Sequence, residues 1–397
     1  MKRLLLKDYN GDVVFTIDET MSENIKDTFA LVPTESVIET AMNYILKLEN
    51  GTLKLSKDSG KTWADKANTF GTIAHAHFFG DGTLLLCTWE KAYWTTDFVT
   101  FTETDIYDED GDPWTCESGG YHFFWQQKLD SVEIIDGVEM HYWGDYRLTG
   151  NTRLWYTTDN GRTLKCCFNF GTSRIDGNII SCRHPHQFIY NKYDGYFYVT
   201  TGDHNGAAEI HLMRGKYTRQ TDSWAWEMIG SGSDFKFGQL LFDENFMYAV
   251  TDYANVQNLL PKGVLKCPMD KLDDPDAYSN AWEDSDSQVA VQAGLVSLII
   301  DKNGRKIMTI DSYQPGYVFV ALGGLNFKCV SLGQTTQIGI RFTGPNYNGD
   351  YYATFKTFDM TQNACSLSFY PTINVTALLR NNGIKWDAAL PIDNAII

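Results

Sequence analysis

The sequence predicts an all-β fold, and three observations carry this prediction. Strand-length runs rich in apolar, β-branched and aromatic residues recur along the chain, as in half-buried strands. Turn residues separate these runs, and no long segment has the spacing of an amphipathic helix. The runs also group in fours, and repeated four-stranded units are typical of a β-propeller. We therefore expect a β-propeller of four-stranded blades.

The repeats predict seven blades, with six as the alternative because the first unit is poorly defined. The seventh unit lacks a fourth strand, and we expect the hairpin in residues 1–35 to supply it and close the ring. The propeller would then span 36–372, with a tail at 373–397 packed on it. The units are predicted at 36–66, 74–105, 121–170, 186–230, 239–285, 296–333 and 338–371.

One turn motif recurs between strands. "SKDSGKTW" at 56–63 has a close copy in "TTDNGRTL" at 157–164 and a shorter one in "TTDFVTF" at 95–101. In the first copy Asp58 can accept backbone hydrogen bonds, and Gly60 can adopt the positive φ of a tight reversal. We expect Trp63 to anchor that turn in a core.

The motif resembles the Asp-box, or BNR repeat, of sialidases and related propellers. The resemblance implies that each copy joins the third and fourth strands of a blade, on the face away from an active site. Segment 182–203 also resembles a segment of sialidase-like propeller proteins of bacteria and phages. Because the Arg-Ile-Pro signature of a true sialidase is absent, hydrolysis of sialosides is not implied.

Composition excludes some classes of function. The net charge of −17 over 397 residues repels a phosphate backbone, so no nucleic-acid partner is expected. No apolar run is long enough to span a membrane. In "MKRLLLKDYNGD" the run of three leucines is too short for the apolar region of a signal peptide. We expect synthesis in the cytoplasm without a signal peptide. The eight cysteines show no C-x-x-C spacing, so we expect them to be reduced, buried thiols.

An acidic insertion at 106–119 contains "DEDGD". This run hints at calcium, but it lacks the spacing of an EF-hand. A solvated loop is the preferred interpretation.

Two rows of polar residues occupy equivalent positions in successive units. Histidines stand at the predicted start of the first strand, and aspartates at the predicted end of the second. In a propeller both positions reach the same mouth of the central channel, where they could bind a divalent metal or perform acid–base chemistry. The alternative is structural, because such an aspartate can cap the following loop. The rows are His75, His77, His122, His184 and His186, and Asp145, Asp203, Asp252 and Asp311.

These rows yield the candidate residues. The catalytic candidates are His184, His186, Arg183 and Tyr121. The metal candidates are His122, His184, His186 and Asp203. Arginines there could hold a carboxylated sugar, and aromatic rings could stack on sugars or pack between blades. The ligand-binding candidates are His75, His77, His122, Asp145, Arg147, Asp203, His204, Asp252, Trp89 and Trp143.

We expect a propeller that recognises a glycan or a cell-surface polysaccharide, as a bacteriophage virion or tail receptor-binding component would, with other virion proteins as partners. The alternative is a carbohydrate-active enzyme, either a polysaccharide lyase or an atypical glycosidase acting on an acidic glycan. A purely structural scaffold is a third interpretation.

Overall fold

The computed structural model describes fourteen stretches and seven further strands of the chain. The stretches are 4–7, 13–17, 35–41, 44–49, 52–57, 62–66, 70, 73–88, 90–116, 121–125, 132–147, 151–202, 206–251 and 264–280. The further strands are 296–300, 306–311, 317–323, 327–334, 338–343, 352–357 and 368–374.

The chain divides into two compact units. The larger unit comprises Val37–Leu260 and Cys267–Tyr278, and the smaller comprises Met1–Ser36, Pro261–Lys266 and Ser279–Ile397. In the described part of the chain the helices are four short 3-10 turns, η1 (Gly206–Glu209), η2 (Arg219–Thr221), η3 (Ser233–Phe235) and η4 (Pro275–Ala277). Within these residues no helix has the length and apolarity needed to cross a membrane.

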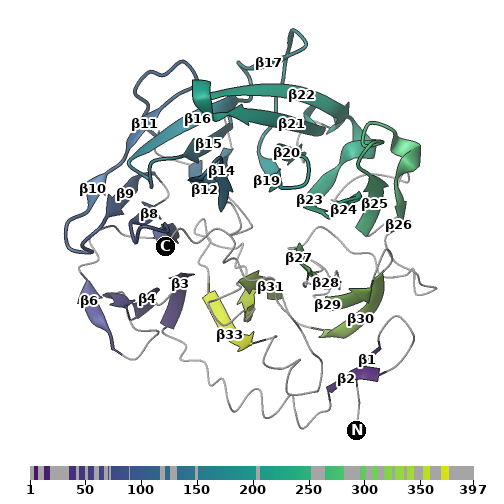
Figure 1. Ribbon diagram of the computed structural model, residues 1–397, viewed down its shortest axis with the longest axis horizontal. Helices are drawn as coiled ribbons and strands as arrows, with labels where there is room; N and C mark the ends of the chain where they lie inside the picture. Colours follow the sequence, from purple (N-terminus) through teal and green to yellow (C-terminus); the bar gives the residue numbers. More distant parts are fainter. Residues whose placement is uncertain are drawn as a thin grey trace. The chain divides into compact units, whose positions relative to one another are not determined.

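Four-stranded meanders follow one another along the chain (Figure 1). The first two are β3 (Glu35–Ala41), β4 (Tyr44–Glu49), β5 (Thr52–Ser56) and β6 (Ala64–Lys66), then β7 (Ile73–Phe78), β8 (Leu84–Thr88), β9 (Ala92–Thr95) and β10 (Thr102–Glu103). The fourth is β19 (Pro185–Asn191), β20 (Tyr196–Thr201), β21 (His211–Thr218) and β22 (Ser223–Ser231). A small hairpin, β17 (Arg174–Ile175) and β18 (Asn178–Ile179), precedes it.

The third sheet is larger than predicted. Its meander is β12 (Tyr121–Trp125), β14 (Val138–Arg147), β15 (Arg153–Thr157) and β16 (Thr163–Asn169). β13 (Val132–Ile135) forms an additional hairpin with β14, and β11 (Asp105–Tyr107) pairs in parallel with β16. The predicted solvated loop at 106–119 is therefore wrong for its first residues, because they extend this sheet.

The fifth sheet holds β23 (Phe237–Phe242), β24 (Phe246–Thr251), β25 (Val264–Pro268) and β26 (Ser279–Asn280). Its last strand begins before the predicted segment at 281–285, which lies outside the described residues.

The smaller unit contains two further meanders and a hairpin. β27 (Val296–Ile300), β28 (Lys306–Asp311), β29 (Tyr317–Gly323) and β30 (Phe327–Gln334) form a four-stranded sheet. β31 (Ile338–Thr343), β32 (Tyr352–Thr357) and β33 (Ser368–Asn374) form a three-stranded one. The predicted tail thus starts inside β33. In the strands described for this unit, β1 (Leu4–Lys7) and β2 (Val13–Ile17) pair with each other, and ring closure by this hairpin stays a prediction.

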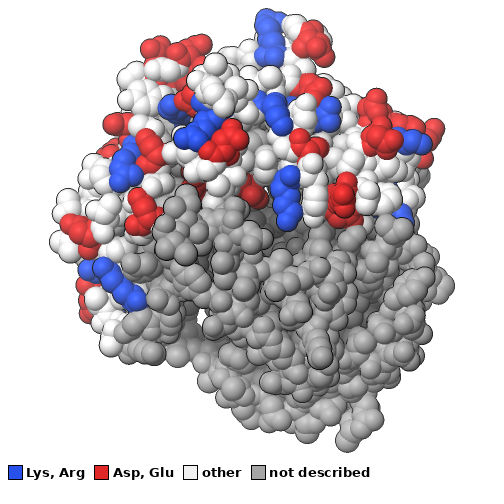
Figure 2. Space-filling model, viewed as in Figure 1, with Lys and Arg blue, Asp and Glu red and all other residues white. Residues whose placement is uncertain are grey.

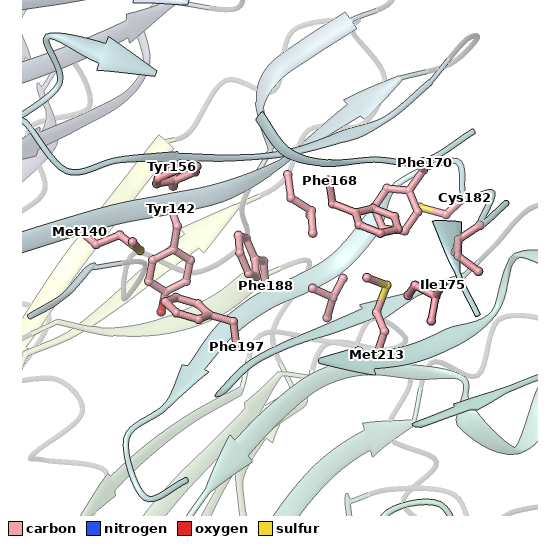
Figure 3. Packing of buried hydrophobic residues seen from close by; sticks show 13 residues of the cluster. Met140, Tyr142, Tyr156, Phe168, Phe170, Ile175, Cys182, Phe188, Phe197 and Met213 are labelled. Carbon is pink, nitrogen blue, oxygen red and sulfur yellow. The ribbon is translucent and has the colours of Figure 1, made fainter. Parts of the chain in front are cut away.

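Successive sheets of the larger unit pack face to face through apolar clusters. Leu53 and Leu55 of the first sheet meet Phe78 and Leu86 of the second. Cluster members from the second and third sheets include Leu85, Cys87, Trp143 and Trp155. A third cluster, shown in Figure 3, joins the third and fourth sheets through Tyr142, Tyr156, Phe188 and Phe197. Consecutive meanders stacked in this way confirm the predicted all-β propeller architecture, while the number of blades remains a prediction.

The third sheet is buried on both faces. Along β14 successive side chains point to opposite faces, so Tyr142 packs toward the fourth sheet and Trp143 toward the second. Their cross-strand partners on β15 repeat the pattern, with Tyr142 opposite Tyr156 and Trp143 opposite Trp155. All four rings are at most 3% exposed.

A glycine permits close approach of the third and fourth sheets. A Cβ atom on Gly144 of β14 would lie 2.2 Å from Cγ of Pro185, the first residue of β19. No side chain fits at that separation, so a glycine is required here.

The 157–163 turn joins β15 to β16, as the sequence motif predicts. Asp159 Oδ1 accepts from the Thr163 amide at 2.9 Å and Asp159 Oδ2 from the Thr163 hydroxyl at 2.7 Å. Thr157 Oγ1 accepts from the Gly161 amide at 3.1 Å. Asn160 and Gly161 have positive φ angles of 59° and 78°. The side chains of Thr157 and Asp159 therefore satisfy the Gly161 and Thr163 amides within the turn.

The 95–101 turn uses the same chemistry between β9 and β10. Asp97 Oδ1 accepts from the amides of Val99 and Thr100, both at 2.8 Å. Phe98 is 3% exposed and anchors this turn. Trp63 does not anchor its own turn as predicted, because it is 36% exposed, while residues 58–61 lie outside the described part.

We expect Gly144→Ala to lower the free energy of unfolding by about 1–3 kcal/mol, because the new methyl group overpacks against Pro185. The measurement is chemical denaturation of the two single variants and of the double variant with Pro185→Ala. Removing the proline ring should recover part of the loss. Equal costs of Gly144→Ala in both backgrounds would contradict the assigned contact.

The 95–101 turn should make stability depend on pH. Hydrogen bonds from Val99 and Thr100 lower the pKa of Asp97 to about 2. A lowered folded-state pKa stabilises the fold above the ordinary aspartate pKa, and this contribution is lost as pH falls through about 4 toward about 2. Titration of the Asp97 carboxyl carbon by NMR should give the low midpoint, and Asp97→Asn should weaken the acid sensitivity. An ordinary midpoint would refute the assignment.

Candidate functional site

One edge of the fourth sheet carries the histidines of segment 182–203. Pro185 pairs with Thr201, and His211 pairs with Ser231. The start of β19, the end of β20 and the start of β21 therefore lie together at this edge, which we call the basic edge. The sequence predicted this juxtaposition for the first two of these positions.

His184 and His186 flank Pro185 at the start of β19, where the pairing with β20 shifts register. Their ring centroids are 5.2 Å apart. His186 Nδ1 lies 2.8 Å from the carbonyl oxygen of Phe237 on β23. Because a carbonyl only accepts, Nδ1 carries the hydrogen, and a neutral His186 therefore has its lone pair on Nε2.

Lys236 joins the two histidines from the segment before β23. A Cβ atom on Gly202, at the end of β20, would lie 2.9 Å from His186 Cε1 and 3.5 Å from Lys236 Cε. Both side chains therefore lie over the same glycine. The sequence pattern missed Lys236, because its place depends on packing between two sheets.

Arg183 completes what we call the basic cluster, defined as Arg183, His184, His186 and Lys236. The Arg183 carbonyl accepts from the hydroxyl of Thr152 at 2.5 Å, which ties the segment to the third sheet. His184, His186 and Lys236 are 7%, 8% and 6% exposed. A cationic side chain such as that of Lys236 attracts an anion more strongly when it is partly buried than it would in water.

His211 lies at the same edge and was also missed. Its Nε2 lies 3.1 Å from the Ser181 carbonyl oxygen, and its Nδ1 lies 3.0 Å from Ser231 Oγ. Burial lowers the pKa of His211, so the ring stays neutral and holds the chain together at the start of β21. In an antiparallel meander the third strand starts at the same edge of the sheet as the first strand. This rule could have identified His211 from the sequence.

Asp145 has the structural role that was the alternative for the aspartate row. Its Oδ1 accepts from the Arg153 amide at 2.7 Å and its Oδ2 from Trp155 Nε1 at 2.9 Å. It is 0% exposed and joins the end of β14 to the first residue of β15. Trp143, predicted to stack on a sugar, is 2% exposed and packs between sheets instead.

His77 lies away from the predicted channel mouth. β7 begins at Ile73, so His77 is near the end of that strand and not at its start. Its Nε2 lies 3.1 Å from Glu139 Oε1, and its ring stacks on His141 with centroids 4.8 Å apart. The predicted register was wrong here, and His77 instead joins the second and third sheets.

Four further candidates are placed by backbone pairing. Tyr121 lies directly opposite Arg147, and His122 opposite Tyr146, at the start of β12 and the end of β14. His75 is opposite Cys87 on β8. Asp203, His204, Asp252 and Trp89 lie outside the described residues.

The metal prediction gains no support from the described residues, which contain no group of three histidine, cysteine, aspartate or glutamate side chains arranged to hold an ion. In the acidic insertion Asp108 Oδ1 accepts from the amides of Asp110 and Asp112, at 3.0 and 2.9 Å. The carboxylate thus shapes its own turn. Figure 2 shows acidic and basic side chains interspersed over the described surface of the visible face.

No family model matches the sequence, and no curated protein matches it. The structure is similar to YCF48 from Cyanidioschyzon merolae, with 10% identity, a TM-score of 0.45, and coverage of 86% of this chain and 96% of that one. It is also similar to the extracellular domain of BT4673 from B. thetaiotaomicron, with 9% identity, a TM-score of 0.47, and coverage of 88% and 42%. The WD40 β-propeller domain of Doa1 has 13% identity, a TM-score of 0.39, and coverage of 80% and 87%. At these scores the fold class rests on the strand pairings themselves.

We expect Asp145→Ala to lower the free energy of unfolding by about 1–3 kcal/mol, because Trp155 Nε1 would be left without its acceptor. Denaturant titration gives the value, with exposed Asp110→Ala as the matched control. An effect no larger than that of the control would contradict the structural role.

Proposed function

We propose that this protein is a recognition propeller that binds an acidic glycan at the basic cluster. The supporting observation is that His184, His186 and Lys236 lie together at one edge, two of them over Gly202, with Arg183 next to His184 in the chain. The chain as a whole carries a net charge of −17. In such an acidic chain, a local group of basic side chains is where an anionic ligand would be attracted.

The chemistry of the cluster suits a sugar carboxylate. An arginine can present two parallel N–H donors to a carboxylate, and a lysine adds a compact charge. Histidines can add further donors when protonated. A uronate or another acidic sugar offers this carboxylate together with ring hydroxyls. A virion or tail component that attaches to a surface polysaccharide is the setting we propose for such binding.

A polysaccharide lyase is the second candidate, and one observation favours it. The Phe237 carbonyl fixes the hydrogen of His186 on Nδ1, which presents Nε2 as the atom that can accept a proton. A lyase needs such a base beside a sugar carboxylate. Tyr121, at the start of β12, remains a candidate partner for the leaving oxygen.

The experiment is a binding screen of the whole chain against polygalacturonate, alginate, hyaluronate and polysialic acid, with neutral dextran for comparison. We expect at least one acidic polymer to bind, more weakly as salt is raised. The combined variant His184→Gln, His186→Gln and Lys236→Met should weaken that affinity by about tenfold or more, since tenfold corresponds to ~1.4 kcal/mol.

Arg174→Gln, on the exposed β17–β18 hairpin, is the matched control and should bind as the wild type does. Circular dichroism and thermal melting establish that each variant is folded. Retention of full affinity by the folded triple variant, or absence of binding to every acidic polymer, would refute the proposal. Ultraviolet absorbance of unsaturated uronate products would establish the lyase in its place.

A further inference from the structure

A concave site lies between the third and fourth sheets, away from the basic cluster. It is a pocket of about 230 Å³. The β13–β14 hairpin, the 157–163 turn and the β21–β22 turn contribute its walls. We call it the turn-face pocket, lined by Ile135, Val138, Met140, Thr158, Tyr217, Arg219 and Asp222.

Strand register places this pocket at the other edge of the fourth sheet. Thr218 pairs with Ser223 at the end of β21, whereas His211 pairs with Ser231 at its start. The basic cluster lies beside the start of β21, and the pocket lies beside its end. The two sites are therefore separated by the length of this strand.

Asp222 is fixed at the pocket wall. It has a left-handed φ of 48°, and its Oδ1 accepts from the hydroxyls of Tyr156 and Tyr217 at 2.9 and 2.8 Å. Lys165 Nζ lies 2.5 Å from Oδ2. Partial burial alone would raise the pKa of Asp222, but the hydrogen bonds from Lys165, Tyr217 and Tyr156 lower it, so the carboxylate stays charged.

Arg219, in the same β21–β22 turn as Asp222, is also held in place. Its Nη1 donates to the carbonyl oxygen of Asp136, in the turn of the β13–β14 hairpin. The guanidinium has further N–H donors for a ligand. The pocket thus offers the remaining acceptor position on Asp222 Oδ2 and the remaining N–H donors of Arg219, and both groups are held by contacts that the protein itself supplies.

The charges around the pocket nearly cancel, which disfavours a charged ligand. Among the lining residues, Asp222 would repel an anion, while Arg219 would repel a cation. Ile135, Val138 and Met140 supply an apolar surface. A neutral molecule with both apolar C–H faces and hydroxyl groups matches this combination, because each hydroxyl can donate to a carboxylate and accept from a guanidinium.

We infer that the turn-face pocket binds one neutral hexose residue. Its volume of about 230 Å³ is below the ~300–1,000 Å³ of pockets for larger ligands, so it accommodates a single sugar ring. The site is additional to the basic cluster and does not depend on the acidic-glycan proposal.

The test uses the whole chain with methyl glycosides of glucose, galactose and mannose, measured by saturation-transfer NMR and by titration of amide shifts. We expect one glycoside to bind saturably in the millimolar range and to shift the amides of Tyr217 and Val138. Val138→Phe should fill the pocket and weaken binding by about tenfold or more, which corresponds to ~1.4 kcal/mol. Arg219→Ala, at an exposed side chain, is the second variant should Val138→Phe fail to fold.

Val99→Phe is the matched control, because Val99 is 75% exposed on the 95–101 turn, and it should leave hexoside binding unchanged. The triple variant of the basic cluster should also retain hexoside binding, which separates the two proposals. No saturable binding by any of the three glycosides would overturn the inference. Binding that survives both Val138→Phe and Arg219→Ala would overturn it too.

Discussion

Burial of the third sheet on both faces is the constraint on which the larger unit depends. Since β14 and β15 alternate between two apolar clusters, neither face of the sheet can turn to solvent. The paired rings Tyr142–Tyr156 and Trp143–Trp155 fix the register, because a shift by one residue would exchange the two faces. Gly144 then allows β19 to approach, and this approach sets the position of His184 and His186 beside Pro185.

Much of the fold could be predicted from local pattern. Alternating runs locate the strands, and the aspartate turns at 95–101 and 157–163 locate the connections between third and fourth strands. β11 and β13 could not be found in this way, because their partners β16 and β14 are chosen by packing along an edge and not by a repeat. Trp63 likewise shows that a large ring in a turn motif need not be buried.

The candidate site was predictable only in part. His184 and His186 are two residues apart in the chain, so their closeness could be expected, and their ring centroids lie 5.2 Å apart. The alignment of one strand with another is harder to predict. The predicted start of the strand β7 was misplaced, so His77 was expected at the channel mouth, whereas it contacts Glu139. Lys236 reaches the cluster from the segment before the fifth sheet. The Asp145 carboxylate accepts hydrogen bonds from the Arg153 amide and the Trp155 indole. The spacing of residues in the sequence predicts neither the position of Lys236 nor the hydrogen bonds of Asp145.

The parallel pairing of β11 with β16 has a consequence for synthesis on the ribosome. β11 precedes every strand of the meander that it borders, yet its partner is the last of them. When Asp105–Tyr107 leaves the exit tunnel, the strand that will receive it has not been translated. The second sheet can close early, whereas the third must await its final strand before this edge is covered. Until then the nascent chain carries this segment without its strand partner.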